Sequence, residues 1–247
     1  MQTNHAQSDS NGRTPAFSLV EMLVVIAIMS ILMTAGSIGV SSMSGKGVSS
    51  GVATAESLFD EARTMAIGKN LRSCVLVAKN LDNNSADNLR RILVATEETD
   101  KVATSATYGQ AKAPTNSTPN WELGSRGAVL PDQTFYSSVY STKSITGGSL
   151  DTVKLTAGTT NIKSAYAGEY YIYQFNSQGI CSTPGASFVV GSGTRNLTGT
   201  TPPKVMASTR RDFGGFVVWR NGRTSVFRNP DQMGSNPPKD LAAGATF

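Results

Sequence analysis

The side chains that most often do chemistry in proteins are scarce in this chain of 247 residues. Its only histidine is His5, and Cys74 and Cys181 lie far apart, without the spacing of metal ligands. Gly45-Lys46 lacks the preceding glycine that a phosphate-binding P-loop requires. We therefore expect no catalytic residues, no metal site and no cofactor, and we do not expect an enzyme.

One carboxylate stands out because of its surroundings. Residues 17–40 are overwhelmingly apolar and contain Glu21, whereas residues 1–16 are polar. As a helix, residues 17–40 would be about 36 Å long, enough to cross a hydrocarbon core of roughly 30 Å. A carboxylate inside such a span costs about 2.5 to 3.5 kcal/mol on insertion scales, so we expect a partner that neutralises Glu21.

The residues around Glu21 resemble the signature of type IV pilin-like prepilins. In that family a peptidase cuts before a phenylalanine, and glutamate is the fifth residue of the mature chain; AFSLVE, starting at Ala16, has this spacing. The resemblance implies that residues 1–16 are a leader removed by a prepilin peptidase between Ala16 and Phe17, and that the new amino group of Phe17 is methylated. It also implies that Glu21 meets the N-terminus of a neighbouring subunit during filament assembly. Ala16 departs from the family, which usually has glycine there.

A helical pattern continues beyond the apolar run. Small and apolar residues recur at alternating four- and three-residue steps, which is one face of a helix, and Leu58 and Met65 widen that stripe. The stripe consists of Val48, Val52, Ala55, Phe59, Ala62 and Ala66. We expect one helix from Phe17 to about Lys69, with residues 17–40 as a transmembrane half and residues 41–70 as an amphipathic half.

Residues 71–247 predict a β-rich globular head. Segments 73–79 and 90–96 flank a polar turn and indicate a hairpin, residues 98–131 indicate a long loop containing Trp121, and Asn221-Gly222 indicates a closing hairpin with a type I′ turn. Further strands are predicted at 134–140, 152–156, 170–175 and 187–190. The expected fold class is α+β, pilin-like, with a long N-terminal helix packed on an antiparallel sheet.

Three further segments resemble the H-type pseudopilins, the GspH/FimT group. They are LFDEARTMAI at the helix end, CVLVA in the first strand and FNSQG before the closing hairpin. The N-terminus is also similar to the pilin-like member of the Verru_Chthon cassette proteins. These resemblances imply a minor pseudopilin of a type II secretion-like or type IV pilus-like filament. They imply a single pass through the bacterial inner membrane, with the head in the periplasm or on an extracytoplasmic filament, and contacts with the membrane, a prepilin peptidase and other subunits.

The charge distribution leaves a second function open. The net charge is +5, and residues 201–247 carry seven Lys or Arg against three Asp, which is +4 of it. Such an excess could attract the phosphates of nucleic acid, as in a DNA-binding minor pilin of an uptake system, although scattered arginines are more often a solvated sheet face. The residues concerned are Arg210, Arg211, Arg220, Arg223 and Arg228.

The same residues are also compatible with a plain membrane-anchored periplasmic domain and with a membrane-tethered enzyme. A carboxylate pair or a calcium site that only the fold brings together is invisible in the sequence. If both cysteines lie outside the cytoplasm, Cys74 and Cys181 could form a disulfide, but the sequence alone does not show whether their Cα atoms are close enough.

Overall fold

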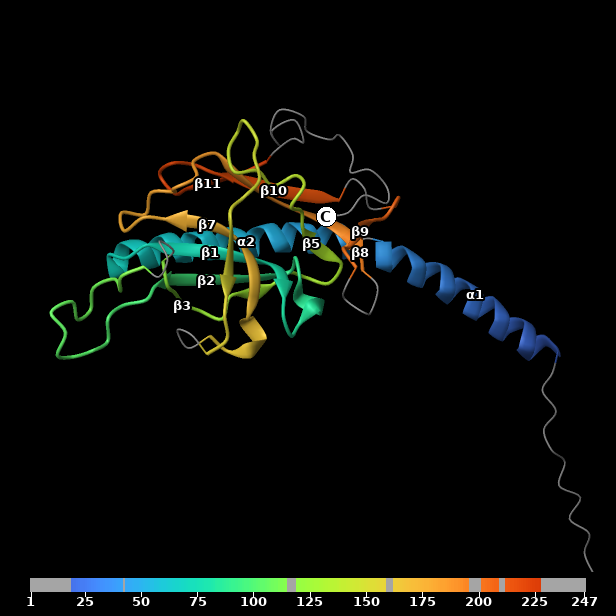
Figure 1. Ribbon diagram of the computed structural model, residues 1–247. Helices are drawn as coiled ribbons and strands as arrows, with labels where there is room; N and C mark the ends of the chain where they lie inside the picture. The colour runs from blue at the N-terminus through green and yellow to red at the C-terminus, as the bar shows by residue number, and fades with distance from the viewer. Residues whose placement is uncertain are drawn as a thin grey trace, which may run out of the picture. The chain divides into compact units, whose positions relative to one another are not determined.

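The computed structural model describes residues 19–41, 43–114, 119–158, 162–195, 201–208 and 212–227. The chain divides into two compact units, Met1–Ser42 and Met43–Phe247, and each is described by itself. The first contains helix α1 (Leu19–Ser41). The second contains helix α2 (Met43–Lys69) and two antiparallel sheets, which confirms the α+β class (Figure 1).

Helix α2 carries the stripe that its sequence predicts. All six stripe residues are buried, from Val48 to Ala66, as is Leu58, while Met65 is partly buried against the same core. The helix ends at Lys69, and Asn70 follows with a left-handed φ of 53°, a conformation common just after a helix. The Leu71 N–H closes the last turn on the carbonyl of Ala66 at 3.2 Å.

The larger sheet has the order β3-β2-β1-β7-β6, with β4 also pairing with β2. The predicted first hairpin is confirmed, because β1 and β2 pair antiparallel with Ser73 opposite Thr96. The predicted long loop is wrong in part: Trp121 begins strand β3 and is buried, pairing with Glu97 of β2. The strands are β1 (Ser73–Leu81), β2 (Arg91–Glu97), β3 (Trp121–Leu123), β4 (Ala128–Val129), β6 (Thr152–Leu155) and β7 (Gly168–Phe175).

The smaller sheet has the order β11-β10-β8-β5, with β9 pairing with β8. Its strands are β5 (Thr134–Tyr136), β8 (Ala186–Thr194), β9 (Lys204–Val205), β10 (Phe213–Val218) and β11 (Thr224–Val226). The closing hairpin is confirmed, but its turn is not type I′, since only Gly222 has a positive φ, of 75°. Instead, Trp219 pairs with Arg223 and the Gly222 N–H bonds the Trp219 carbonyl, which makes a three-residue loop.

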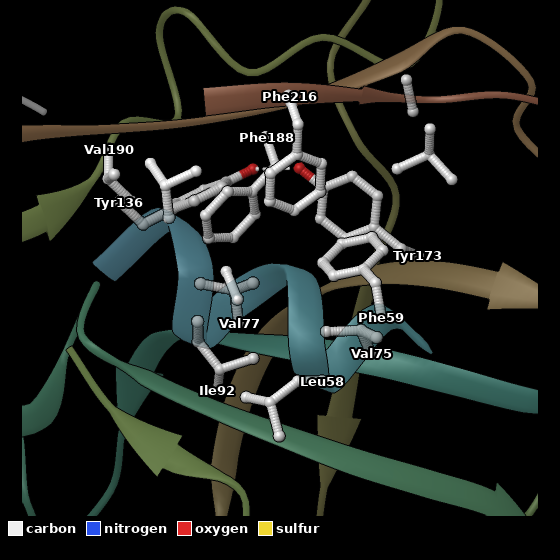
Figure 2. Close-up of a cluster of buried hydrophobic side chains, with 14 of the residues drawn as sticks. Leu58, Phe59, Val75, Val77, Ile92, Tyr136, Tyr173, Phe188, Val190 and Phe216 are labelled. Atoms are coloured by element: carbon white, nitrogen blue, oxygen red, sulfur yellow. Dashed lines mark hydrogen bonds between the residues drawn. The ribbon is translucent and has the colours of Figure 1, made fainter. Parts of the chain in front are cut away.

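The main core lies where α2 packs between the two sheets. Figure 2 shows Val75, Val77 and Ile92 of the larger sheet on one side of the helix, and Phe188 and Phe216 of the smaller sheet on the other. Phe59 of α2 is fully buried among them. Each sheet thus packs its inner face on the helix, and α2 belongs to the same hydrophobic cluster as both sheets.

Two tyrosine hydroxyls inside this core satisfy each other. The Tyr136 and Tyr173 hydroxyls lie 3.0 Å apart, and Tyr173 donates to the Ser187 carbonyl at 2.8 Å. Burial raises the pKa of both tyrosines above the ordinary value, so both stay protonated at neutral pH. The network is therefore a structural link between β5, β7 and β8.

The outer face of the larger sheet has a second hydrophobic cluster. Side chains that alternate with the inner ones point there, including Cys74, Leu76 and Leu93, and Trp121 and Ile162 pack beside them. Two short 3-10 turns lie in the connections, η1 (Ser85–Asp87) and η2 (Ser164–Tyr166). The larger sheet is thus covered on both faces, which explains why β1 and β2 are almost continuously apolar.

Part of the predicted loop is an ordered arm, residues 98–112. Its two sides are joined by backbone bonds, such as those between residues 98 and 112 and between 100 and 110. Asp100 organises the tip, because hydrogen bonds from the Ser105 and Thr107 hydroxyls and the Val102 N–H lower the pKa of its carboxyl to about 2. The ionised Asp100 carboxylate thus accepts hydrogen bonds that join residues across the tip of the arm.

The segment that we predicted as a single helix, from Phe17 to about Lys69, contains the two helices α1 and α2. Ser42, between them, lies outside the described residues. In the part of the chain that the structure describes, no helix meets the length and apolarity needed to cross a bilayer.

Candidate functional site

The N-terminal helix α1 is apolar on all sides. Its described side chains from residue 19 to 30 include nine exposed large hydrophobic ones, which is the opposite of an amphipathic surface helix. They are Leu19, Val20, Met22, Leu23, Val24, Val25, Ile26, Ile28 and Met29. A helix with no polar face requires an apolar environment on every side, which lipid or neighbouring helices can supply.

Glu21 lies in the first turn of this helix and is exposed. The unpaired N–H groups of a helix start carry partial positive charge, so an acidic side chain is electrostatically favourable there. A full positive charge close to the same turn would neutralise the carboxylate more completely. The predicted cleavage and methylation residues, Ala16 and Phe17, lie outside the described residues.

The two cysteines are both buried and both free. Cys74 belongs to the outer cluster of the larger sheet, whereas Cys181 belongs to the main core around α2. The sheet therefore lies between the two environments, and the structure contains no Cys74–Cys181 disulfide. Burial raises the pKa of the Cys74 thiol well above its ordinary value, and burial also raises that of Cys181.

Of the five arginines predicted to contact nucleic acid, the structure describes two. Arg220 and Arg223 are exposed on the turn between β10 and β11, and neither forms an ion pair with a described residue. The Arg63 side chain of α2 lies against the same turn, because a Cβ placed on Gly222 would be 2.8 Å from its Cδ atom. Arg210, Arg211 and Arg228 lie outside the described residues.

Two surface hollows of the head are each lined by an ion pair and one further cation, Lys69 in the first and Arg195 in the second. One, of about 400 Å³, contains the Arg72–Glu97 ion pair at 2.5 Å, and the other, of about 350 Å³, contains the Lys79–Glu169 pair at 2.8 Å. Among the described residues, no group of three His, Cys, Asp or Glu side chains is placed to hold a metal ion.

A third hollow, of about 260 Å³, lies between the β3–β4 turn and η2. Its walls include Arg126 and Lys163, which sequence reasoning missed. Their separation along the chain gives no pattern, and only the packing of the turn beside η2 brings them to one hollow. The net positive charge of the chain was visible in the sequence, but most of it lies in residues 201–247 and so drew attention to the C-terminal part.

Comparison with known proteins bears on the N-terminal segment. Residues 13–37 match the family model described as the prokaryotic N-terminal methylation motif. No curated protein matches the chain. No solved structure matches it either. The motif covers the predicted cleavage point, Glu21 and most of α1, and it indicates processing by a prepilin peptidase and assembly with other pilin subunits. The chain therefore carries the N-terminal motif of type IV pilin-like precursors.

Proposed function

We propose that this protein is a minor pseudopilin, a structural subunit of a type II secretion-like or type IV pilus-like filament, without catalytic chemistry of its own. The observation that carries the proposal is the position of Glu21. It lies in the first turn of a helix that is apolar on all sides, within a matched methylation motif. That helix belongs to a different compact unit from the head.

The assembly step follows from electrostatics. Cleavage before Phe17 would free an amino group four residues before Glu21, and methylation leaves that amine able to carry positive charge. In an apolar environment an ionised carboxylate is costly, and the amine of a neighbouring subunit would lower that cost for Glu21 by bringing a full positive charge close to it. The charge pair therefore favours a subunit next to another subunit over a subunit surrounded by lipid.

Contacts within the head support a place in the H-type group. The turn at residues 175–179 packs on the end of α2, since a Cβ on Gly179 would lie 2.8 Å from Ile67 Cδ1. The Asn176 carboxamide holds this turn by accepting the N–H groups of Gln178 and Ile180. The segments that carry the resemblance are thus packed together, with the first strand, β1, paired to β7 just before the turn.

The proposal places α1 in the bacterial inner membrane and the head in the periplasm or on an extracytoplasmic filament. A membrane position suits the exposed apolar side chains of α1. The partners are then the membrane, a prepilin peptidase and other filament subunits.

The test compares Glu21→Gln with Asp60→Asn in the native host. Asp60 is an exposed carboxylate on α2, so its variant removes one negative charge at a distance from the motif. Glu21→Gln should be processed and should reach the membrane but fail to enter sheared filaments, while Asp60→Asn assembles normally. N-terminal sequencing should find methylated Phe17 in both. Normal assembly of Glu21→Gln would refute the mechanism.

A second candidate is a DNA-binding minor pilin, which the exposed Arg220 and Arg223 favour. Trp219 precedes them and is also exposed, with its indole N–H held by the Ser225 hydroxyl at 2.8 Å. Phosphate contacts would make affinity strongly dependent on salt. Loss of DNA binding in an Arg220→Gln/Arg223→Gln variant, with a shallower salt dependence, would support this function; no binding by the wild type at low salt would exclude it.

A further inference from the structure

We propose that the hollow between the β3–β4 turn and η2 binds the compact oxyanion of a phosphate group. The hollow has a volume of about 260 Å³ and is lined by Leu123, Gly124, Ser125, Arg126, Lys163 and Tyr166. Both charged side chains in this lining are cations. The lining contains no carboxylate, and it therefore favours a negatively charged group.

The two cations have no acidic partner among the described residues. Neither Arg126 nor Lys163 takes part in any ion pair there. The carboxylate next to Leu123 in the chain, Glu122, is held by Lys101 at 2.6 Å. Asp87 is held by Arg91. Asp82 adjoins η2 through its N–H bond to the Ala167 carbonyl and forms no ion pair with a described residue, but it does not line the hollow, so the two cations of the lining are left for a ligand.

The other polar groups of the hollow are hydroxyls. The Ser125 hydroxyl accepts from the Gly127 N–H at 3.3 Å, which leaves its own proton to donate. The Tyr166 hydroxyl has no hydrogen-bond partner among the described residues. Arg91 lies 5.3 Å from the centre of the Tyr166 ring and stacks on it, which helps to fix the position of that ring. Two cations and two hydroxyl donors suit the several acceptor oxygens of an oxyanion.

Both walls of the hollow are held by the fold. The N–H groups of Gly124 and Ser125 donate to the Val94 carbonyl at 2.9 and 3.3 Å, which ties the turn to β2. Gly127 has a φ of 60° and approaches β2 so closely that a Cβ would lie 1.8 Å from the Ile92 carbonyl oxygen. On the other wall, the Tyr170 hydroxyl donates to the Tyr166 carbonyl at 2.7 Å. The backbone of both walls is thus held in place, while the Arg126 and Lys163 side chains that it carries are exposed.

The inference does not depend on the filament role, because it rests only on residues of the head. The ligand chemistry has two possible sources, a free phosphate or the phosphate headgroup of a lipid, and the experiment separates them. The full chain in neutral detergent is titrated with inorganic phosphate by calorimetry. In parallel, the reconstituted chain is compared on vesicles of phosphatidylcholine with and without phosphatidic acid.

The key variant is Arg126→Gln/Lys163→Gln, and the matched control is Lys154→Gln/Lys204→Gln, which makes the same charge change at exposed residues elsewhere. We expect the key variant to weaken phosphate binding at least tenfold and the control to stay within twofold. Unchanged melting temperatures would show that both variants are folded. A preference for phosphatidic acid without binding of free phosphate would assign the site to a lipid headgroup. Binding of neither, or equal loss in the control, would overturn the proposal.

Discussion

Phe59 connects α2 to both sheets, so its truncation tests the architecture of the head. The side chain has 0% exposure, and its ring meets four others edge-on, with centroids 5.0 to 6.2 Å away. The partners are Tyr173, Phe175, Phe188 and Phe216, from β7, β8 and β10. Tyr173 and Phe175 come from the larger sheet and Phe188 and Phe216 from the smaller one, so none can fill the space left by Phe59 without leaving its own sheet.

The expected cost is at the upper end for a core truncation. Phe→Ala changes in cores cost about 3 to 5 kcal/mol, and each aromatic pair adds about 0.5 to 1.5 kcal/mol beyond burial. We expect Phe59→Ala to lower the free energy of unfolding by about 4 to 5 kcal/mol, and Phe59→Leu, which keeps most of the volume, by about 1.5 to 2.5 kcal/mol.

The assay is urea unfolding of the full chain in mild detergent, followed by tryptophan fluorescence, because Trp121 is buried in the head. Ile67→Ala is the control on the same helix, since Ile67 is half exposed and should lose less than about 1 kcal/mol. A loss below about 2 kcal/mol for Phe59→Ala, or one equal to the control, would refute the view that α2 joins the two sheets.

Three other predictions use glycine geometry, a carboxyl pKa and a thiol. Gly222→Ala should lower the free energy of unfolding by about 1 to 3 kcal/mol, because φ is 75° and a Cβ would lie 2.3 Å from the Gly179 carbonyl oxygen. Gly68 faces open space, so Gly68→Ala should instead stabilise α2 by up to about 1 kcal/mol. Thermal melts of the two variants measure the difference. The Asp100 carboxyl should titrate near 2 in an NMR titration, and Ser105→Ala should raise that pKa. Because the pKa is lowered in the folded chain, the contribution of Asp100 to the stability of the arm is complete above the ordinary value of 3.8 and is lost as pH falls toward 2. Cys74 should resist alkylation until the protein unfolds, and rapid labelling of the folded protein would contradict its burial.

The helix stripe and the hairpins could be predicted because their signals are local. The steps between Val48 and Ala66 follow the period of a helix, and all members of the stripe are buried. Asn221-Gly222 predicted the position of the last turn but not its type. There the Arg63 side chain and the Gly179 carbonyl crowd Gly222, so contacts distant in sequence influence the local geometry.

The pairing of distant strands was not visible in the sequence. β1 pairs with β7 across most of its length although about 90 residues separate the two strands in the chain, and no local pattern indicates that order. Trp121 was misjudged for the same reason, since a three-residue strand is too short to show a period. The candidate functional residues show the same contrast. The motif around Glu21 is contiguous in the sequence and could be predicted, whereas Arg126 and Lys163 line one hollow only because of the fold.

The apolar side chains of α1 explain why this helix needs an apolar environment, and under the proposed filament role Glu21 selects which environment is favoured. Nine of them are 42 to 81% exposed, and covering the remaining surface is worth about 1 kcal/mol each, or roughly 9 kcal/mol together. That exceeds the cost of about 3 kcal/mol for one buried carboxylate, so α1 should enter an apolar environment with or without Glu21. Lipid and neighbouring helices supply that apolar term almost equally, because lipid tails are as apolar as leucine. Under the proposed filament role, the amine of a neighbouring subunit would also neutralise the carboxylate, so this charge would favour the filament over lipid where the apolar surface does not discriminate between them.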